Sequence, residues 1–264
     1  MTMEVLRLQD LQKSFGNVRA LKNASFTLNE GEVVALLGDN GAGKSTLIKA
    51  ISGVFPADHG DIFVRGEKAS IRSTRDAMDL GIETIHQDTS LAPDLSIARN
   101  LFLGREPVNF GWLGVFAPLD LELRNAASAL LKRVGISKKL DADALVSTLS
   151  GGERQSIAIS RAMQFAAKVI ILDEPTNNLG VEETHGVLRF VKEVRDAGHS
   201  VLLITHNIHH VFQVADRIIV MRRGEIVAEQ TVADTDLLTV ESIITGADMS
   251  ALLKEAGKVK DVAW

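Results

Sequence analysis

The feature that most constrains this chain is a glycine-rich stretch, Gly38–Ser45, with the sequence Gly-Asp-Asn-Gly-Ala-Gly-Lys-Ser. It follows an apolar run, Val33–Leu37, and leads into a predicted helix that includes Thr46. A strand, a glycine-rich turn and a helix N-terminus form a phosphate-binding loop, because several backbone N–H groups and the helix dipole face one anion. Lys44 is expected to reach the outer phosphates and the Ser45 hydroxyl to ligate Mg²⁺. This phosphate loop predicts a nucleoside triphosphate site.

Composition narrows the class of protein further. The 264 residues are enough for one large domain or two subdomains. The net charge of −5 argues against a nucleic-acid partner, which calls for a basic surface. The absence of cysteine excludes a disulfide framework and thiolate metal sites, and suits the cytosol. The N-terminus lacks the apolar core of a signal peptide, and no apolar run approaches the ~18 residues of a membrane span, so work at a membrane would require a partner.

Two side chains before the middle of the chain have more than one interpretation. Residues 5–28 tend to alternate between apolar and polar, which predicts antiparallel strands with Phe15 in the turn between them. An aromatic there would stack on an adenine base or fill a core or turn, and position alone leaves both open. Gln87 follows a predicted buried strand, Ile82–Ile85, where it would reach a metal or water. A lone glutamine at a strand exit is more often a loop residue.

The middle of the chain, residues 88–167, is predicted to be a mainly helical insert in an α/β frame. Helical spacing recurs over Ser96–Leu103 and Leu121–Val134. Between them, Arg105–Pro118 is an irregular loop with two aromatics, which marks either a docking surface or a loop folded over its own small core.

A second glycine-rich element, Leu149-Ser150-Gly151-Gly152-Glu153, precedes a predicted helix, Glu153–Ala166. Alone it indicates an N-capped helix start. The same residues also offer a second phosphate cradle, since backbone N–H groups at a helix N-terminus bind anions.

Charged side chains follow two predicted buried strands. Asp173 and Glu174 come after an apolar run, at the strand end where α/β folds place their chemistry. Asp173 fits a metal role through water, and Glu174 fits a base that polarises attacking water. His206 follows the next such strand, with His209 and His210 close by. A histidine metal cluster is disfavoured, because the chain has no cysteine and no suitably spaced carboxylate.

Taken in order, the phosphate loop, Gln87, Leu149–Glu153, the strand ending in Asp173-Glu174 and His206 resemble the ATP-binding cassette (ABC) ATPase of a transporter, over about residues 4–246. Strings at residues 86–88, 103–106, 205–212 and 215–217 resemble the bacterial monosaccharide-importer subfamily in its single-cassette, fructose-type form.

The resemblance implies an α/β fold: a P-loop NTPase (RecA-like) core with an N-terminal antiparallel β subdomain and an inserted α-helical subdomain. Residues 4–246 would form a single ABC ATPase domain. Residues 1–87 and 168–230 would make the catalytic core with its β subdomain, 88–167 the helical insert that carries the signature motif, and 231–264 a C-terminal tail.

The resemblance also implies how the site works. Two copies of the chain would form a head-to-tail dimer that sandwiches two ATP molecules, with Mg²⁺, between the phosphate loop of one copy and the signature of the other. Nucleotide-binding residues would be Phe15, Gly38, Asp39, Asn40, Gly41, Ala42, Gly43, Lys44, Ser45, Thr46 and Gln87. The signature acting in trans would be Leu149, Ser150, Gly151, Gly152 and Glu153. The catalytic residues would be Glu174, His206 and Lys44, and the metal would be held by Ser45, Gln87 and, through water, Asp173.

The implied partners are a second copy, integral-membrane permease subunits and, indirectly, a periplasmic sugar-binding protein, with no nucleic acid. The chain would lie peripherally on the cytoplasmic face of the inner membrane. Gly180 stands where most cassettes have an aspartate that couples the two sites, although the sugar-importer subfamily often shares this glycine.

Three alternatives remain open: a cassette for a non-sugar transporter, a soluble ABC protein acting on ribosomes or DNA, and a nucleotide-dependent regulatory module without turnover. The soluble class is disfavoured because the chain has no second cassette, coiled coil or basic face. Glu174 argues against the regulatory module, which can dispense with a base.

Overall fold

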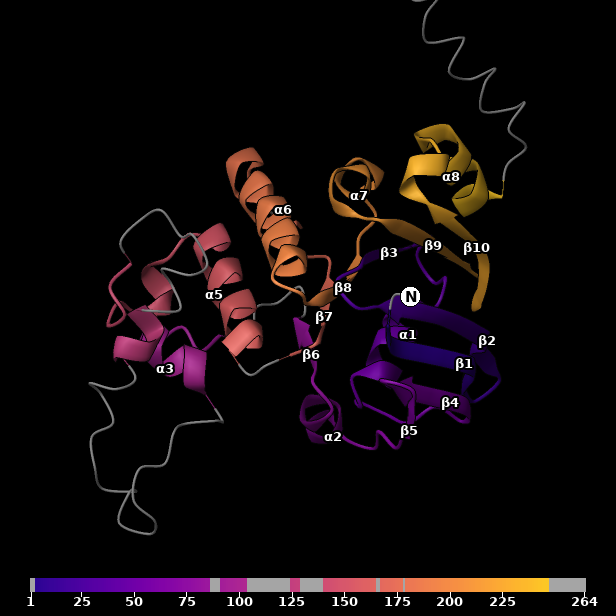
Figure 1. The fold of residues 1–264 in the computed structure, drawn as a ribbon, viewed down its shortest axis with the longest axis horizontal. Helices are drawn as coiled ribbons and strands as arrows, with labels where there is room; N and C mark the ends of the chain where they lie inside the picture. The colour runs from indigo at the N-terminus through magenta and orange to yellow at the C-terminus, as the bar shows by residue number, and fades with distance from the viewer. Residues whose placement is uncertain are drawn as a thin grey trace, which may run out of the picture.

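The computed structural model describes residues 3–85, 91–103, 124–128, 140–164, 167–177 and 179–246 (Figure 1). Its centre is a six-stranded sheet in the order β10-β9-β3-β8-β7-β6. Every pair is parallel except β10 with β9, which form an antiparallel hairpin. The strands are β3 (Val33–Leu37), β6 (Ile82–Ile85), β7 (Val169–Asp173), β8 (Ser200–Ile204), β9 (Arg217–Arg222) and β10 (Glu225–Thr231).

Both faces of this sheet are covered, which is why its central strands read as continuous apolar runs. All five residues of β3 are buried, and so are all five of β8. Val34 and Leu36 of β3 share one apolar core with α1, while Ala35 and Leu37 share another with α7. The helices of this part are α1 (Lys44–Ile51), α6 (Val181–Asp196), α7 (Ile208–Val214) and α8 (Leu237–Thr245).

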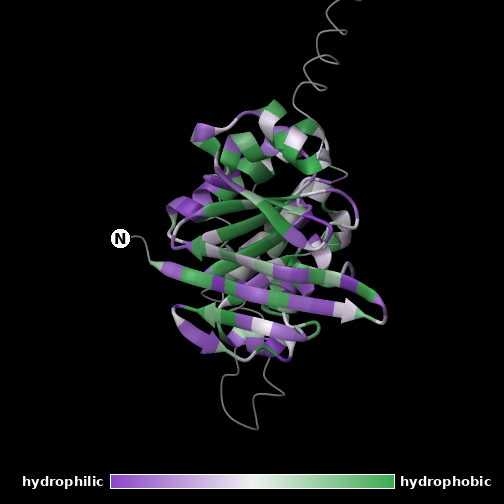
Figure 2. Cartoon of the chain, turned by 90° about the vertical axis from the view of Figure 1, so that its right-hand side faces the viewer, coloured by the Kyte–Doolittle hydropathy of each residue, from purple (hydrophilic) through white to green (hydrophobic). Residues whose placement is uncertain are grey.

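A second, antiparallel sheet has the order β2-β1-β4-β5. Its longest strands alternate between polar and apolar residues, visible as alternating purple and green in Figure 2. The buried residues of β1 and β2 share one apolar core with α1 and with Ala42 of the phosphate loop. This sheet therefore packs against the helix that follows the loop. The strands are β1 (Glu4–Phe15), β2 (Val18–Asn29), β4 (His59–Val64) and β5 (Glu67–Ala69).

The helical elements α3 and α5 lie at the opposite end of the molecule from β1 and β2 (Figure 1). They have an apolar core of their own, in which Ile97, Leu101, Val146 and Ile157 are buried. The elements of this helical part are α3 (Ile97–Phe102), the short 3₁₀ turn η2 (Val146–Thr148) and α5 (Gly151–Gln164). A further helix, α2 (Thr74–Asp79), lies near β6 of the central sheet.

These elements confirm the predicted fold class of an α/β P-loop core with an antiparallel β part and a helical part. Helix α5 begins at Gly151, two residues earlier than the predicted start at Glu153. The short strand β5 and helix α8 had not been assigned from the sequence. The loop Arg105–Pro118 lies outside the described residues.

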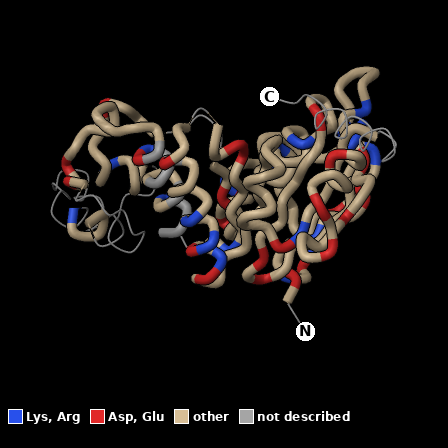
Figure 3. Tube along the Cα trace, turned by 90° about the horizontal axis from the view of Figure 1, so that it is seen from above, with Lys and Arg blue, Asp and Glu red and all other residues tan. Residues whose placement is uncertain are grey.

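In the view of Figure 3, the positions of Lys and Arg along the described chain are interspersed with those of Asp and Glu. Within the same described ranges, none of the helices has the length and hydropathy needed to cross a bilayer.

Candidate nucleotide-binding site

The phosphate loop joins β3 to α1, and its shape depends on glycine at two positions. Gly38 and Gly43 both have positive φ, 150° and 109°. A Cβ on Gly38 would collide with the carbonyl oxygen of Met221, and one on Gly43 would lie 2.8 Å from that of Ala20. Helix α1 has no side-chain cap at its start, so its first N–H groups are left for an anion.

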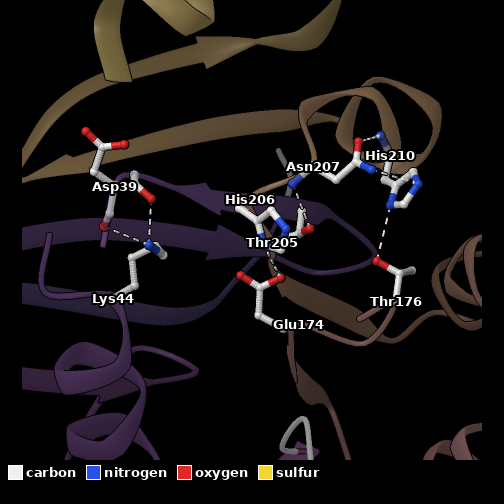
Figure 4. Close-up of polar contacts among 9 residues, drawn as sticks. Asp39, Lys44, Glu174, Thr176, Thr205, His206, Asn207 and His210 are labelled. Atoms are coloured by element: carbon white, nitrogen blue, oxygen red, sulfur yellow. Dashed lines mark hydrogen bonds and ion pairs between the residues drawn. The ribbon is translucent and has the colours of Figure 1, made fainter. Parts of the chain in front are cut away.

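Lys44 lies folded across the loop (Figure 4). Its Nζ donates to the carbonyl oxygens of Gly38, at 2.6 Å, and Asp39, at 3.0 Å. Burial lowers the pKa of Lys44, while the carboxylates of Glu174, Asp39 and Asp173 oppose that shift. The ammonium group is thus partly desolvated and held by two carbonyl dipoles at the mouth of the loop.

A cavity of about 540 Å³ connects the phosphate loop with the ends of two neighbouring strands. Because β3, β8 and β7 are adjacent and parallel, their carboxyl ends meet at one edge of the sheet. The cavity is lined by Gly38, Asp39, Asn40, Lys44, Ser45, Asp173, Glu174, Asn177, Ile204 and His206. The candidate residues Lys44, Ser45, Asp173, Glu174 and His206, spread over more than half of the chain, therefore line one space.

Glu174 has a backbone conformation that is rare for its type, with φ at +51°. Its N–H donates to the carbonyl oxygen of Ile204 at 2.9 Å, which fixes the turn after β7 to β8. Its carboxylate oxygen Oε2 lies 3.0 Å from Nδ1 of His206 (Figure 4). The carboxylate is mostly shielded from solvent, with 16% of the side chain exposed, whereas the His206 side chain is 68% exposed.

A second polar cluster lies beside this pair, and sequence reasoning had not found it. Thr176 Oγ1 is 3.1 Å from Nδ1 of His210, and Asn207 Nδ2 is 3.1 Å from Nε2 of the same ring. The sequence had raised His210 only as a metal candidate. Within the described residues, no group of three or more His, Cys, Asp or Glu side chains is arranged to hold a metal ion.

A neighbouring cavity of about 500 Å³ extends from the phosphate loop along the start of β2, where Val18, Arg19 and Ala20 line it. Phe15, at the end of β1, is half exposed, and its ring packs edge-on against Phe55 with centroids 5.3 Å apart. Phe15 pairs with Val18, which lines this cavity, although Phe15 itself is not among the lining residues. An exposed aromatic ring offers a stacking face.

The signature segment Leu149–Glu153 lies apart from both cavities. Ser150 and Glu153 form a reciprocal capping box at the start of α5: Glu153 N–H donates to Ser150 Oγ at 3.3 Å, and Ser150 N–H donates to Glu153 Oε2 at 2.9 Å. None of the described residues that line the two cavities comes from this segment. Gln87 falls outside the described residues.

The oxygen ligands that line the first cavity fit Mg²⁺. The Ser45 hydroxyl and the Asp173 carboxylate line the same cavity, and both are oxygen ligands. Mg²⁺ takes few protein ligands and fills its shell with water and phosphate oxygens, so a hydroxyl and a carboxylate suffice as the protein's share.

A parallel sheet with a phosphate loop after one strand and paired carboxylates after another defines the class of P-loop nucleotide-hydrolysing proteins. The ABC transporter family model matches residues 21–177. The chain is 44% identical over 242 residues to the xylose/arabinose import ATP-binding protein XylG of Sulfolobus acidocaldarius, covering 92% of this chain and 94% of that protein. It is 43% identical to the fructose import ATP-binding protein FrcA of Rhizobium meliloti, with 92% and 94% covered.

Among longer relatives, the galactofuranose transporter ATP-binding protein YtfR of Escherichia coli is 40% identical and is covered over 50% of its length. Among solved structures, the ADP conformation of MJ1267, an ATP-binding cassette of an ABC transporter, superposes with a TM-score of 0.79 at 27% identity, covering 96% of this chain and 99% of that one. The chain belongs to the ABC transporter family and is an ABC ATPase that binds ATP. The resemblance predicted from its motifs is confirmed.

Proposed function

We propose that this chain is the ATP-hydrolysing subunit of an importer for a monosaccharide or a related polyol. The import proteins for xylose/arabinose and fructose match it at 44% and 43% identity over nearly their whole length. The observation that supports ATP hydrolysis is the cavity lined together by Lys44, Ser45, Asp173, Glu174 and His206.

In the proposed mechanism the side chains of the site divide nucleotide binding and hydrolysis between them. Phe15 stacks on the adenine, and the amides of residues 38–46 hold the phosphates. Lys44 exchanges its two carbonyl partners for phosphate oxygens. Glu174 accepts a proton from the attacking water, and His206 orients that carboxylate and contacts the γ-phosphate. The rate gain comes mostly from positioning and from electrostatic stabilisation of the transferred group.

Mg²⁺ would be held by Ser45, by Asp173 through water and by Gln87, which lies outside the described residues. When bound, the ion neutralises charge that develops on the phosphate oxygens. The residues of this chain do the rest: they bind the nucleotide, exclude bulk water and take up the proton at the Glu174 carboxylate.

The partner of each site is a second copy of the chain. The segment Leu149–Glu153 lines neither cavity of its own subunit, which supports a role on the nucleotide of the other. The insert would transmit closure of this dimer to permease subunits. The chain would then lie peripherally on the cytoplasmic face of the inner membrane, with a periplasmic sugar-binding protein as an indirect partner. The net charge of −5 supports the expectation that nucleic acid is not a partner.

The decisive experiment is light scattering on Glu174→Gln, with and without Mg·ATP. This variant keeps the phosphate loop but lacks the proposed base, so we expect it to bind ATP, lose turnover and double in mass. Lys44→Ala, the matched control, should bind no nucleotide and keep its mass. Hydrolysis by Glu174→Gln at the wild-type rate would refute the assignment of the base.

The transported substrate is tested in cells. Deletion of the gene should abolish uptake of one labelled sugar or polyol from a panel, and Glu174→Gln should not restore it. Loss of amino-acid uptake, with the whole sugar panel unaffected, would contradict the sugar assignment.

A further inference from the structure

His210 connects two turns that both carry proposed catalytic side chains. Thr176 lies two residues after Glu174, and Asn207 follows His206 directly. The imidazole of His210 lies between them, with Nδ1 3.1 Å from Thr176 Oγ1 and Nε2 3.1 Å from Asn207 Nδ2 (Figure 4). One ring therefore joins the turn after β7 to the start of α7.

The hydrogen-bond partners decide which ring nitrogen carries the proton. Asn207 caps α7: its Oδ1 accepts from the backbone N–H of His210, at 3.3 Å. A backbone N–H can only donate, so the oxygen of the Asn207 amide must face it and the Nδ2 group must face the ring. The Nδ2 group can only donate, so Nε2 of His210 accepts. The neutral ring then has its proton on Nδ1, which donates to Thr176 Oγ1.

The surroundings of His210 favour this neutral state. Burial lowers its pKa, and so do three nearby histidines: His185 on α6, His209 on α7 and His206 before α7. A second proton would put a donor on Nε2 opposite the Nδ2 donor of Asn207, and that contact would be lost.

The turn that His210 holds needs support, because Glu174 is in the left-handed region at φ +51°. Such a conformation persists where neighbouring contacts determine it. On one side the Glu174 N–H is bound to Ile204 O, and on the other the Asn177 N–H donates to Glu174 O at 3.2 Å. The hydrogen bond that His210 Nδ1 donates to Thr176 Oγ1 is a side-chain contact that ties this turn to α7.

We infer that His210, as the neutral imidazole protonated at Nδ1, is a positioning residue for ATP hydrolysis that holds the Glu174 turn against the start of α7. This rests on the proposed role of Glu174 as the base. The bond to Thr176 keeps the carboxylate of Glu174 in register with His206, whereas the phosphate loop is not involved.

Four variants separate this role from a merely structural one. His210→Asn keeps an N–H donor near Nδ1, and His210→Gln keeps an acceptor near Nε2 but loses the donor to Thr176. Thr176→Val removes the hydroxyl at nearly constant shape. His209→Ala, an exposed neighbour of the same type, is the matched control.

We expect kcat to fall about threefold to tenfold in His210→Gln and in Thr176→Val, as for the loss of one hydrogen bond, with the KM for ATP unchanged. His210→Asn should stay within about twofold of wild type, and His209→Ala should be unchanged. The double variant His210→Gln/Thr176→Val should be no slower than either single one, because both remove the same contact.

The ring itself is tested by NMR of the nucleotide-free chain labelled with ¹⁵N-histidine. The inference requires the Nδ1–H tautomer of His210 in wild type. The Nε2–H tautomer would overturn it, and so would wild-type kcat in His210→Gln while Glu174→Gln is inactive. Activity in Glu174→Gln would instead overturn the proposed base and leave the NMR result standing, so the two failures are distinguishable.

Discussion

At the scale of single residues, Lys44 shows how the phosphate loop holds a charge before a ligand arrives. Its ammonium donates to the carbonyl oxygens of Gly38 and Asp39. Partial burial lowers the pKa of Lys44, against the opposing effect of the carboxylates of Glu174, Asp39 and Asp173. Negative phosphates in the same place would raise that pKa, because an opposite charge favours the charged form. Lys44 therefore couples nucleotide binding to proton uptake.

The coupling predicts the pH dependence of ATP affinity. A group whose pKa is raised on binding supports affinity fully below the pKa of the free state, and the gain is lost as pH rises through the pKa of the bound state. We expect affinity for ATP to decline towards alkaline pH, measured by calorimetry from neutral pH upwards. Lys44→Met should bind weakly with no such alkaline decline. Wild-type affinity that is flat up to pH 10 would contradict this account.

Residue roles differed in how far the sequence alone revealed them. Motif spacing singled out Lys44, Asp173, Glu174 and His206, because their residue types recur at fixed places relative to predicted strands. The contact of His210 with Thr176 spans 34 residues and depends on β7 lying beside β8, which no local pattern contains. The positive φ of Glu174 is likewise set by the tertiary structure, since glutamate does not favour it.

At the scale of elements, backbone from other parts of the chain comes close to both ends of helix α1, at Gly43 before it and at Gly53 after it. Gly53, just after α1, has a φ of +73°, and a Cβ there would collide with the carbonyl oxygen of Ser73, the cap of α2. Gly66, in the turn between β4 and β5, has a φ of +81° and open space around it. The two glycines thus share a left-handed backbone but differ in their surroundings.

This pair gives a stability prediction with its own control. Gly66→Ala should lower the free energy of unfolding by about 1 kcal/mol, the cost of a left-handed alanine. Gly53→Ala should cost more than about 3 kcal/mol, because backbone must move as well. Urea unfolding measures both values. Equal losses in the two variants would show that α1 does not depend on this approach.

Most elements were predictable from periodicity, and the exceptions have physical reasons. The sequence predicted that this helix starts at Glu153, after two glycines, and glycine is a poor helix former. The capping box between Ser150 and Glu153 outweighs that preference and starts the helix at Gly151. Strand β5 has only three residues, too few for alternation to be read.

At the scale of the whole molecule, the position of the signature segment is the feature that the single chain does not explain. Ser150 caps α5 in the helical part, while Lys44 and Glu174 line a cavity beside the central sheet that Ser150 does not reach. The sequence predicted both glycine-rich elements, and the family resemblance implied that they serve the nucleotides of different copies. Their separation within one chain depends on how the helical part packs against the sheet, which no local pattern contains.

A mixed dimer decides whether Ser150 acts in trans. One preparation carries Lys44→Ala in one subunit and Ser150→Ala in the other, and a second carries both changes in the same subunit. If the signature serves the other subunit's nucleotide, the first arrangement damages one site twice and leaves one intact, whereas the second damages both. We expect ATP hydrolysis near half of wild type in the first and near zero in the second.

The two preparations contain the same substitutions, so the loss of the α5 cap, worth about 1 kcal/mol, affects both equally. Differently tagged subunits allow each mixed dimer to be purified before its ATPase rate is measured. Action in cis reverses the order, because both changes in one subunit would then leave the other subunit whole. Equal rates in the two arrangements would show that Ser150 belongs to no single site, and the sandwich of two ATP molecules would have to be abandoned.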